Sequence, residues 1–298
     1  MHMILNRSHI HLNSQKKELP PNGLELFPIT ANDGDIHQYP ADYIPVHWHT
    51  ELELFVLTEG VVDIGIGEHS LRLTAGEGCF INTGVLHSFH APEPGACHYH
   101  SFVFDPSIVG GMPGSVFDIS YVRPLLNSGT PFLKFEKDGS DAPFFQCFTD
   151  AYSACENEKR GYEFEVRSAF SKLLLYILEK LPAASSTSVT HAQEKRLKAA
   201  LEWIGSNLKN DISTETLSAA CHVSPRECQR MFQKYLHVSP TEYIRRQRIF
   251  LAADLLSTTD DPVTEIGSRC GFASPSYFSS EFKKIIGKTP VEYRKRQE

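Results

Sequence analysis

The feature that most constrains the fold of this chain is a repeat with a 50-residue period near its C-terminus. Two Ser-Pro pairs open the copies, at Ser224-Pro225 and Ser274-Pro275. At the same offset Phe232, Lys234, Pro240, Glu242 and Tyr243 recur as Phe282, Lys284, Pro290, Glu292 and Tyr293. Each copy holds a short helical run, a tight turn and a second helix starting at the Ser-Pro pair, which is the pattern of a helix-turn-helix module. The C-terminal third is therefore predicted to be all-α, with two such modules.

Caps predict where these helices begin. Ser224, Ser239 and Thr289 are each followed by proline and, three residues on, by glutamate. The hydroxyl and the carboxylate can then satisfy free backbone N–H groups reciprocally at a helix N-terminus. Asp261-Pro262 and Ser274-Pro275 supply a cap and a proline for two further helices, without the glutamate. From Pro240 to about Ser257, the apolar period predicts one continuous helix between the modules.

The first half of the chain has a different pattern. Short apolar runs at Leu52–Leu57, Val61–Ile66 and Ser101–Phe104 alternate with glycines, as in a β-sandwich or barrel. Helical periods follow near 142–158 and 162–181. The second of these helices has an apolar stripe that could cover the barrel or meet a second subunit, made of Phe164, Ala169, Phe170, Leu173, Leu174, Ile177 and Leu178.

Four segments follow from these patterns. An N-terminal arm and an all-β barrel are expected over 1–140, and a helical dimerisation or packing segment over 141–181. The small polar residues from Pro182 to Thr190 indicate a linker over 182–190. The two helix-turn-helix modules then occupy 191–298.

Charge separates the two halves. The net charge of −7 combines +4 over residues 191–298 (17 Lys+Arg against 13 Asp+Glu) with −11 over residues 1–190. A basic C-terminal part suits a polyanion such as DNA, although a run of cations is also typical of a solvated helix face. The start of the chain lacks a signal-peptide pattern, no apolar run is long enough for a membrane span, and the seven cysteines form no Cys-x-x-Cys pair. We therefore expect a cytoplasmic protein without membrane contact.

The chain resembles the AraC family of transcription regulators over essentially its full length. The motifs that carry the resemblance are Leu217-x-x-Ala-Cys-x-Val-Ser-Pro225, Arg230-x-Phe232, Arg248-x-x-x-Ala252-x-x-Leu255-Leu256 and Ile266-Gly-x-x-Cys-Gly-Phe-x-Ser-x-Ser-Tyr-Phe-x-x-x-Phe-Lys283, followed by Thr289-Pro290. The resemblance implies a seven-helix domain whose two recognition helices enter successive major grooves of operator DNA. It also implies an N-terminal domain that senses a signal, and we expect a homodimer.

The resemblance makes Pro225–Tyr235 and Pro275–Lys284 the recognition helices. The first would present Arg226, Gln229 and Arg230, residue types that read guanine and adenine edges. The second would present Ser276, Ser279 and Ser280, with a serine at position 280 where the family often has arginine, so we expect positioning more than base readout from it. The remaining candidate contacts, mainly to phosphates, are Lys234, Ser274 and Lys283.

The first half resembles a cupin barrel. His47-x-His49-x3-Glu53-x6-Gly60 and Gly76-x5-Asn82-x-Gly84-x2-His87 match that superfamily's two motifs, except that Asn82 and Ala91 replace a usual proline and asparagine. The resemblance implies a pocket lined by His47, His49, Glu53 and His87. These side chains could bind Zn, Mn, Fe or Ni, or hydrogen-bond an effector directly, for example a carbohydrate.

The alternation of side chains along a β-strand also predicts that these residues share one pocket. If residues 47–54 form one strand, His47, His49, Glu51 and Glu53 share one face, and the residues between them share the other. Four further histidines could add to the pocket, although each alone is more often structural: His37, His90, His98 and His100.

Three functions are compatible with these motifs. The leading interpretation is a regulator with no catalytic residues, whose barrel senses a small molecule. The alternative is a metal-dependent cupin enzyme fused to a DNA-binding tail. A third is a constitutive DNA-binding protein whose barrel is filled by its own side chains.

Overall fold

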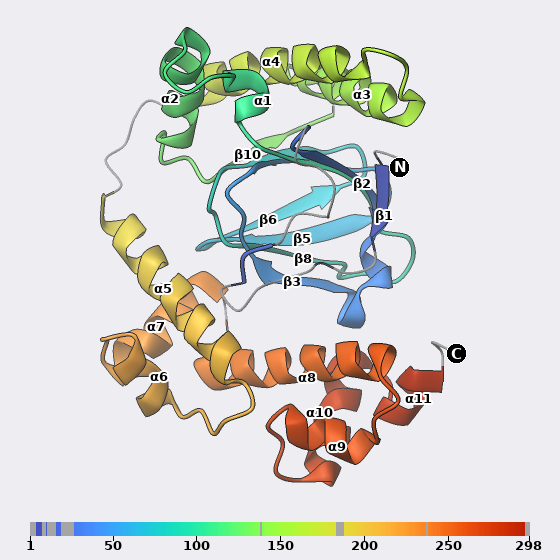
Figure 1. The fold of residues 1–298 in the computed structure, drawn as a ribbon, viewed down its shortest axis with the longest axis vertical. Helices are drawn as coiled ribbons and strands as arrows, with labels where there is room; N and C mark the ends of the chain where they lie inside the picture. The colour runs from blue at the N-terminus through green and yellow to red at the C-terminus, as the bar shows by residue number, and fades with distance from the viewer. Residues whose placement is uncertain are drawn as a thin grey trace. The chain divides into compact units, whose positions relative to one another are not determined.

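The computed structural model describes residues 4–7, 10, 16–18, 27–137, 139–182, 188–236 and 238–295 (Figure 1). The chain divides into two compact units: the first ends at Ser188, and the second begins at Val189 and also includes Lys16. The first unit is rich in strands and the second is helical, as the sequence predicts. Within the described part of the chain, no helix combines the length and apolar composition that a bilayer span requires. Each unit is described separately below.

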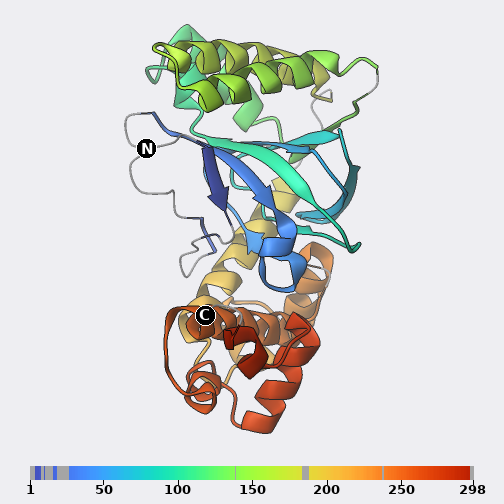
Figure 2. The same ribbon diagram turned by 90° about the vertical axis from the view of Figure 1, so that its right-hand side faces the viewer.

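Two sheets form the first unit. The six-stranded sheet has the order β1 (Ile4–Arg7), β2 (Ile29–Asp35), β9 (His98–Phe104), β4 (Leu52–Leu57), β7 (Gly78–Ile81) and β10 (Phe132–Phe135). The four-stranded sheet has the order β3 (Tyr43–His47), β8 (His87–His90), β5 (Val61–Ile66) and β6 (His69–Thr74). All the pairs are antiparallel except β1 with β2. The sheets face each other as a barrel-like sandwich (Figure 2).

The six-stranded sheet is apolar on both faces because it separates two cores. On β4, Leu52 and Leu54 belong to a core shared with helices α3 (Ala142–Asn157) and α4 (Tyr162–Lys180), whereas Phe55 and Leu57 face the interior between the sheets. Strand alternation sends successive side chains to opposite faces. Helices α3 and α4 cover the outer face of this sheet (Figure 1).

The apolar stripe predicted on α4 therefore covers the barrel, with one exception. Phe170, Leu173 and Ile177 are buried in the shared core. Phe164, which we assigned to the same stripe, has 77% of its surface exposed. It lies in the first turn of α4, next to the exposed Glu163 and Glu165 and away from the sheet-facing side.

Residues 47–54 do not form one strand, so the predicted alternation over this segment is wrong. β3 ends at His47 in the four-stranded sheet, and β4 begins at Leu52 in the six-stranded sheet. The chain changes sheets between them, so His49 lies in a connection and Glu51 is half-buried outside both strands. His47, His49 and Glu53 are nevertheless all buried.

Short helices complete the first unit. They are η1 (Ile36–Gln38), η2 (Pro40–Asp42), α1 (Ser107–Gly110), the π-helical η3 (Asp118–Val122) and α2 (Arg123–Leu126). Asp141 joins three elements near the start of α3. Its carboxylate accepts hydrogen bonds from the Glu136 N–H (3.0 Å), the Tyr176 hydroxyl (2.7 Å) and the Lys180 ammonium (2.8 Å). These hydrogen bonds connect the end of β10 to helices α3 and α4.

The second unit contains both predicted modules. The first pairs α6 (Thr214–Ala220) with α7 (Pro225–Leu236), and the second pairs α9 (Val263–Arg269) with α10 (Pro275–Ile286). The remaining helices are α5 (Ser188–Asn207), α8 (Pro240–Thr258) and α11 (Pro290–Lys295). α7 and α10 start 50 residues apart, as do α8 and α11, so the sequence repeat corresponds to repeated structure.

Most helix starts agree with the capping prediction. Ser224, Ser239 and Ser274 each accept a hydrogen bond from the backbone N–H three residues on, at 3.1, 3.2 and 3.4 Å. At Thr289 the reciprocal bond is present too, because Thr289 N donates to Glu292 Oε2 at 2.8 Å. Pro262 is the N-cap of α9 rather than its first residue, because the Asp261 carboxylate pairs with Arg269 instead of capping the helix.

The predicted linker is partly helical. Residues 183–187 lie outside the described residues, and α5 begins at Ser188, inside the segment 182–190. Serine and threonine have moderate helix propensity, so a small polar composition does not exclude a first helical turn. The helical unit thus begins slightly before the boundary placed at 191.

Candidate functional sites

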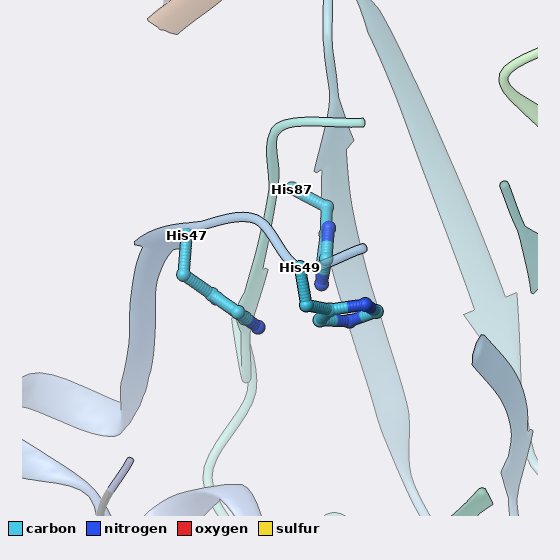
Figure 3. Close-up of side chains that lie close together, drawn as sticks. All are labelled: His47, His49 and His87. Atoms are coloured by element: carbon cyan, nitrogen blue, oxygen red, sulfur yellow. The ribbon is translucent and has the colours of Figure 1, made fainter. Parts of the chain in front are cut away.

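Three histidines meet inside the barrel (Figure 3). His47 at the end of β3 lies opposite His87 at the start of β8 in the strand register, and their ring centroids are 4.1 Å apart. His49 reaches the same place from the connection to β4, with its ring centroid 5.0 Å from that of His87. One candidate metal-binding atom from each ring lies within 4.8 Å of the other two. The sequence motifs thus led to residues that the fold brings together.

Backbone carbonyls fix the orientation of all three rings. Nδ1 of His47, His49 and His87 lies 2.8, 3.0 and 2.9 Å from the carbonyl oxygens of Pro45, Glu51 and Val85, respectively. A carbonyl oxygen can accept but not donate, so each Nδ1 must carry the proton and donate it. Nε2 is then the atom left for a ligand, and this arrangement is typical of histidines that bind metal ions.

Glu53 completes the cluster from β4. Its Oε2 lies 3.3 Å from His49 Nε2 and 3.1 Å from His87 Nε2. The His87 Nε2 is buried and, although the Glu53 carboxylate is close, makes no aligned hydrogen bond. An orphaned imidazole nitrogen beside a carboxylate is the donor set that a divalent transition metal fits.

Burial and mutual charge shift the pKa values in this cluster. Burial, together with the neighbouring His87 and His49, holds the pKa of His47 well below its ordinary value, which favours the neutral ring. Burial would also lower the pKa of His49, but the Glu53 carboxylate outweighs it and raises that pKa. For Glu53, the two imidazoles outweigh burial, so its pKa lies well below the ordinary range and the carboxylate is ionised.

A small cavity of about 20 Å³ adjoins the cluster. This volume holds about one water molecule. Asn32 lines it, and the Oδ1 of this side chain is buried without a hydrogen-bond partner. The other side chains around it combine aromatic rings with polar groups and include Tyr39, His47, Glu53, Phe55, Phe89, Tyr99 and Ser101.

Glu18 is a further carboxylate at this cavity that the sequence analysis missed. Its Oε2 lies 3.9 Å from His47 Nε2, and its backbone N–H donates to the Trp48 carbonyl at 2.9 Å. Nothing in the local sequence pattern connects residue 18 with the barrel. The four other candidate histidines are not among the residues that line the cavity: His37 pairs with Asp42, His98 and His100 lie near acidic residues of β2, and His90 is exposed.

The candidate DNA-binding surface starts with α7. Arg226, Gln229 and Arg230 are all exposed on one side of this helix, while Met231 and Phe232 are buried. Gln233 continues the exposed side one turn further and was missing from our prediction. Lys234 is half-buried, with its ammonium 5.1 Å from the centre of the Tyr235 ring. The spacing i, i+3, i+4, i+7 could have identified Gln233 from the sequence.

Helix α10 presents a different chemistry. Ser276, Ser280 and Lys283 are exposed and Ser279 is half-buried, while Ser274 caps the helix. Tyr277, absent from our prediction, is half-exposed.

The arginines of α8 have other partners. Arg245 pairs with Glu281 at 3.2 Å, Arg246 with Glu242 at 2.9 Å, and Arg248 donates to the backbone carbonyls of Leu208 and Asn210 at 3.0 and 2.6 Å. This cation run therefore binds within the unit rather than offering a free basic surface.

Comparisons with known proteins agree with both units. A model described as "AraC-like ligand binding domain" matches residues 33–174, and one described as "Helix-turn-helix domain" matches residues 217–296. The uncharacterized HTH-type transcriptional regulator YdeC of Bacillus subtilis is 26% identical, over 95% of this chain and 97% of its own. The arabinose operon regulatory protein of Salmonella typhimurium is 28% identical, over 82% of each chain. Wild-type ToxT from Vibrio cholerae, a solved structure, covers 90% of this chain and 95% of its own at 15% identity and a TM-score of 0.45.

A ligand-binding β domain followed by two helix-turn-helix modules defines a transcriptional regulator that binds DNA and a small molecule. The chain belongs to the AraC family of such regulators. The named relatives are regulators, which indicates a regulator here rather than a metal-dependent enzyme.

Proposed function

We propose that this cytoplasmic regulator converts occupancy of its barrel into a change in operator binding. The observation that carries the proposal is the convergence of three oriented, buried Nε2 atoms on Glu53, in a chain that also has two helix-turn-helix modules. Two members of this cluster, His47 and Glu53, line a small cavity. A filled, apolar interior would need no such donors. The cluster therefore favours a sensing barrel over a purely structural one.

The operator is bound through both modules. Arg226, Gln229 and Arg230 can reach base edges from α7, where guanidinium and amide groups make paired hydrogen bonds to purines. Lys234 and Lys283 suit phosphates. Ser274, Ser276, Ser279 and Ser280 can fix the register of α10 through short hydrogen bonds.

Helix α8 sets the distance between the modules. Its 19 residues at 1.5 Å each span roughly 28 Å, close to the ~34 Å of one DNA turn. One protein domain should thus cover two adjacent major grooves. Methylation interference should give two contact clusters about 10 base pairs apart. A single contacted groove per monomer would contradict the two-module geometry.

The barrel is proposed to hold a divalent ion such as Zn, Mn, Fe or Ni. His47, His49 and His87 would bind it through Nε2, and Glu53 through its carboxylate. Bound there, the ion would act as a Lewis acid toward a ligand oxygen. The His87 Nε2, which makes no aligned hydrogen bond, and the Nδ1 contacts to carbonyls support this assignment.

The cavity volume bears on the effector. Names among the relatives, such as the arabinose operon regulatory protein, suggest a carbohydrate. A cavity of about 20 Å³ accepts an ion or a water but not a sugar unless the surrounding side chains move. A thermal-shift screen of metal ions, sugars and sugar acids, run with and without a chelator, separates these effectors. Stabilisation by none of them would contradict a ligand-sensing barrel with these donors.

The protein is also proposed to be a homodimer that pairs through α4. Phe164, Ser168, Ser171 and Leu175 follow the 4-3-4 spacing of a coiled-coil seam, and Phe164 and Leu175 are exposed. A second copy of α4 would cover the side chains of Phe164 and Leu175. Sedimentation equilibrium should give a dimer for the wild type and for the control Lys172→Glu, and a monomer for Phe164→Glu. A dimer in all three proteins would place the interface elsewhere.

A further inference from the structure

Tyr277 is a large aromatic side chain exposed on a recognition helix. It lies in the first turn of α10, and 50% of its surface is accessible, whereas Phe278 and Phe282 on the same helix are fully buried. A core role is therefore excluded for its ring. Exposed aromatic side chains in a DNA-binding surface are available for contact with bases.

The local structure holds Tyr277 in place. Its backbone N–H donates to the Ser274 hydroxyl, which caps α10, at 3.4 Å. The Phe272 ring lies 6.1 Å from the Tyr277 ring, centre to centre, at an angle of 58°. A side chain that is already ordered loses little conformational entropy on binding.

The exposed side chains beside Tyr277 on α10 are not of the types that read purines, and the nearby Arg248 guanidinium already donates to backbone carbonyls. Ser276 and Ser280 flank it on the exposed side of α10, where α7 has Arg226, Gln229 and Arg230. Hydroxyls are tolerant hydrogen-bond partners, so they discriminate weakly between bases. An apolar ring edge, by contrast, can contact the C5-methyl group of thymine, which no other base carries in the major groove.

We propose that Tyr277 is the specificity-determining residue of the second module and that it reads thymine methyl groups. The operator is then chemically asymmetric. Its α7 half-site is selected through purine hydrogen bonds, and its α10 half-site through thymines. This inference rests on DNA binding by both modules.

The main rival role is a phosphate contact by the Tyr277 hydroxyl. Two substitutions separate the two roles. Tyr277→Phe keeps the ring and removes the hydroxyl. If Tyr277 contacts thymine methyl groups, this variant loses less than twofold in affinity, whereas a phosphate contact by the hydroxyl would be lost. Tyr277→Ala removes both groups.

The experiment uses the full-length protein and an operator selected with it from random DNA. Each thymine is replaced singly by deoxyuridine, which removes one methyl group and leaves base pairing intact. With wild-type protein and Tyr277→Phe, one or two replacements in one half-site should weaken binding about fourfold each, the value of one buried methyl. With Tyr277→Ala, overall affinity should fall about tenfold and the same replacements should have no effect.

The outcomes distinguish failure of DNA binding from failure of the role proposed for Tyr277. Failure to select any operator would contradict DNA binding itself. Two results with a selected operator would overturn the role of Tyr277 alone. Either the deoxyuridine replacements still weaken binding by Tyr277→Ala, or they do not weaken binding by the wild-type protein. Arg230→Ala is the matched control, because it should weaken binding while leaving the deoxyuridine effects in the other half-site unchanged.

Discussion

Gly271→Ala tests whether the turn of the second module depends on a residue without a side chain. Gly271 follows α9 with φ = +85°, in the left-handed region. A Cβ added there would lie 2.6 Å from the Leu208 carbonyl oxygen and 2.9 Å from the Arg248 guanidinium. Neither neighbour can move freely, since Arg248 Nε donates to that same carbonyl at 3.0 Å.

The expected loss follows from two costs. A left-handed backbone costs an L-residue roughly 1–2 kcal/mol. Relieving the close contacts by shifting Leu208 or Arg248 costs about 1–3 kcal/mol more. Gly271→Ala should therefore lower the free energy of unfolding of the helical unit by about 2–5 kcal/mol, and weaken DNA binding by displacing α10.

The matched control is in the first module. His222 occupies the corresponding turn after α6 with φ = +54°. His222→Gly relieves backbone strain in the folded state but adds conformational entropy to the unfolded state. The free energy of unfolding should therefore change by less than about 1 kcal/mol. Urea unfolding in a Trp48→Phe background, which leaves Trp203 as the reporter in the helical unit, measures both variants. A loss below about 1 kcal/mol for Gly271→Ala would refute the packing argument.

Four other substitutions test the sites and the fold. Arg230→Ala should weaken the binding free energy on the operator by ~1–3 kcal/mol and relax the preference at one base position. Lys283→Ala should weaken binding to all sequences equally and reduce the slope of log affinity against log salt by about one. Identical binding titrations for the two variants would show that the division into base and phosphate contacts is wrong. His87→Ala should weaken ion-induced stabilisation and the effector response while leaving basal DNA binding within a few-fold, measured by thermal shift and gel retardation. Unchanged stabilisation would remove His87 from the site. Burial would raise the pKa of Asp141, but Lys180 and its other donors lower it to about 2. Its contribution to stability is therefore present above pH 4 and lost as the pH falls from about 4 toward 2. Asp141→Asn should flatten acid unfolding in that range, and an unchanged acid profile would contradict this.

Local signals in the sequence predicted elements well where they act within a few residues. Pro225 and Pro275 begin α7 and α10 as their Ser-Pro caps indicate, and the β4 and β5 runs match the observed strands exactly in extent. At Pro262 the same signal failed by one residue, because the Asp261 side chain pairs with Arg269. A distant partner can thus override a cap, and no local pattern reveals that partner.

Non-local contacts explain what else the sequence did not predict. The alternation expected over residues 47–54 assumed a single strand, but the chain leaves one sheet at His47 and enters the other at Leu52. Glu18 joins the cavity from a segment 29 residues before His47. Tyr277 is exposed because the buried side of α10 is already filled by Phe278 and Phe282. Each of these outcomes depends on how separate elements pack.

The histidine cluster combines both kinds of information. Each ring is oriented by a carbonyl two residues away, so the direction of its Nε2 is encoded locally. The meeting of the three rings is not local, because it requires β3, β8 and the connection to β4 to come together. Loss of one histidine therefore leaves the other two oriented, since neither ring depends on the missing one for its Nδ1 hydrogen bond. Ion affinity should consequently fall in steps as histidines are removed, rather than disappear through collapse of the barrel.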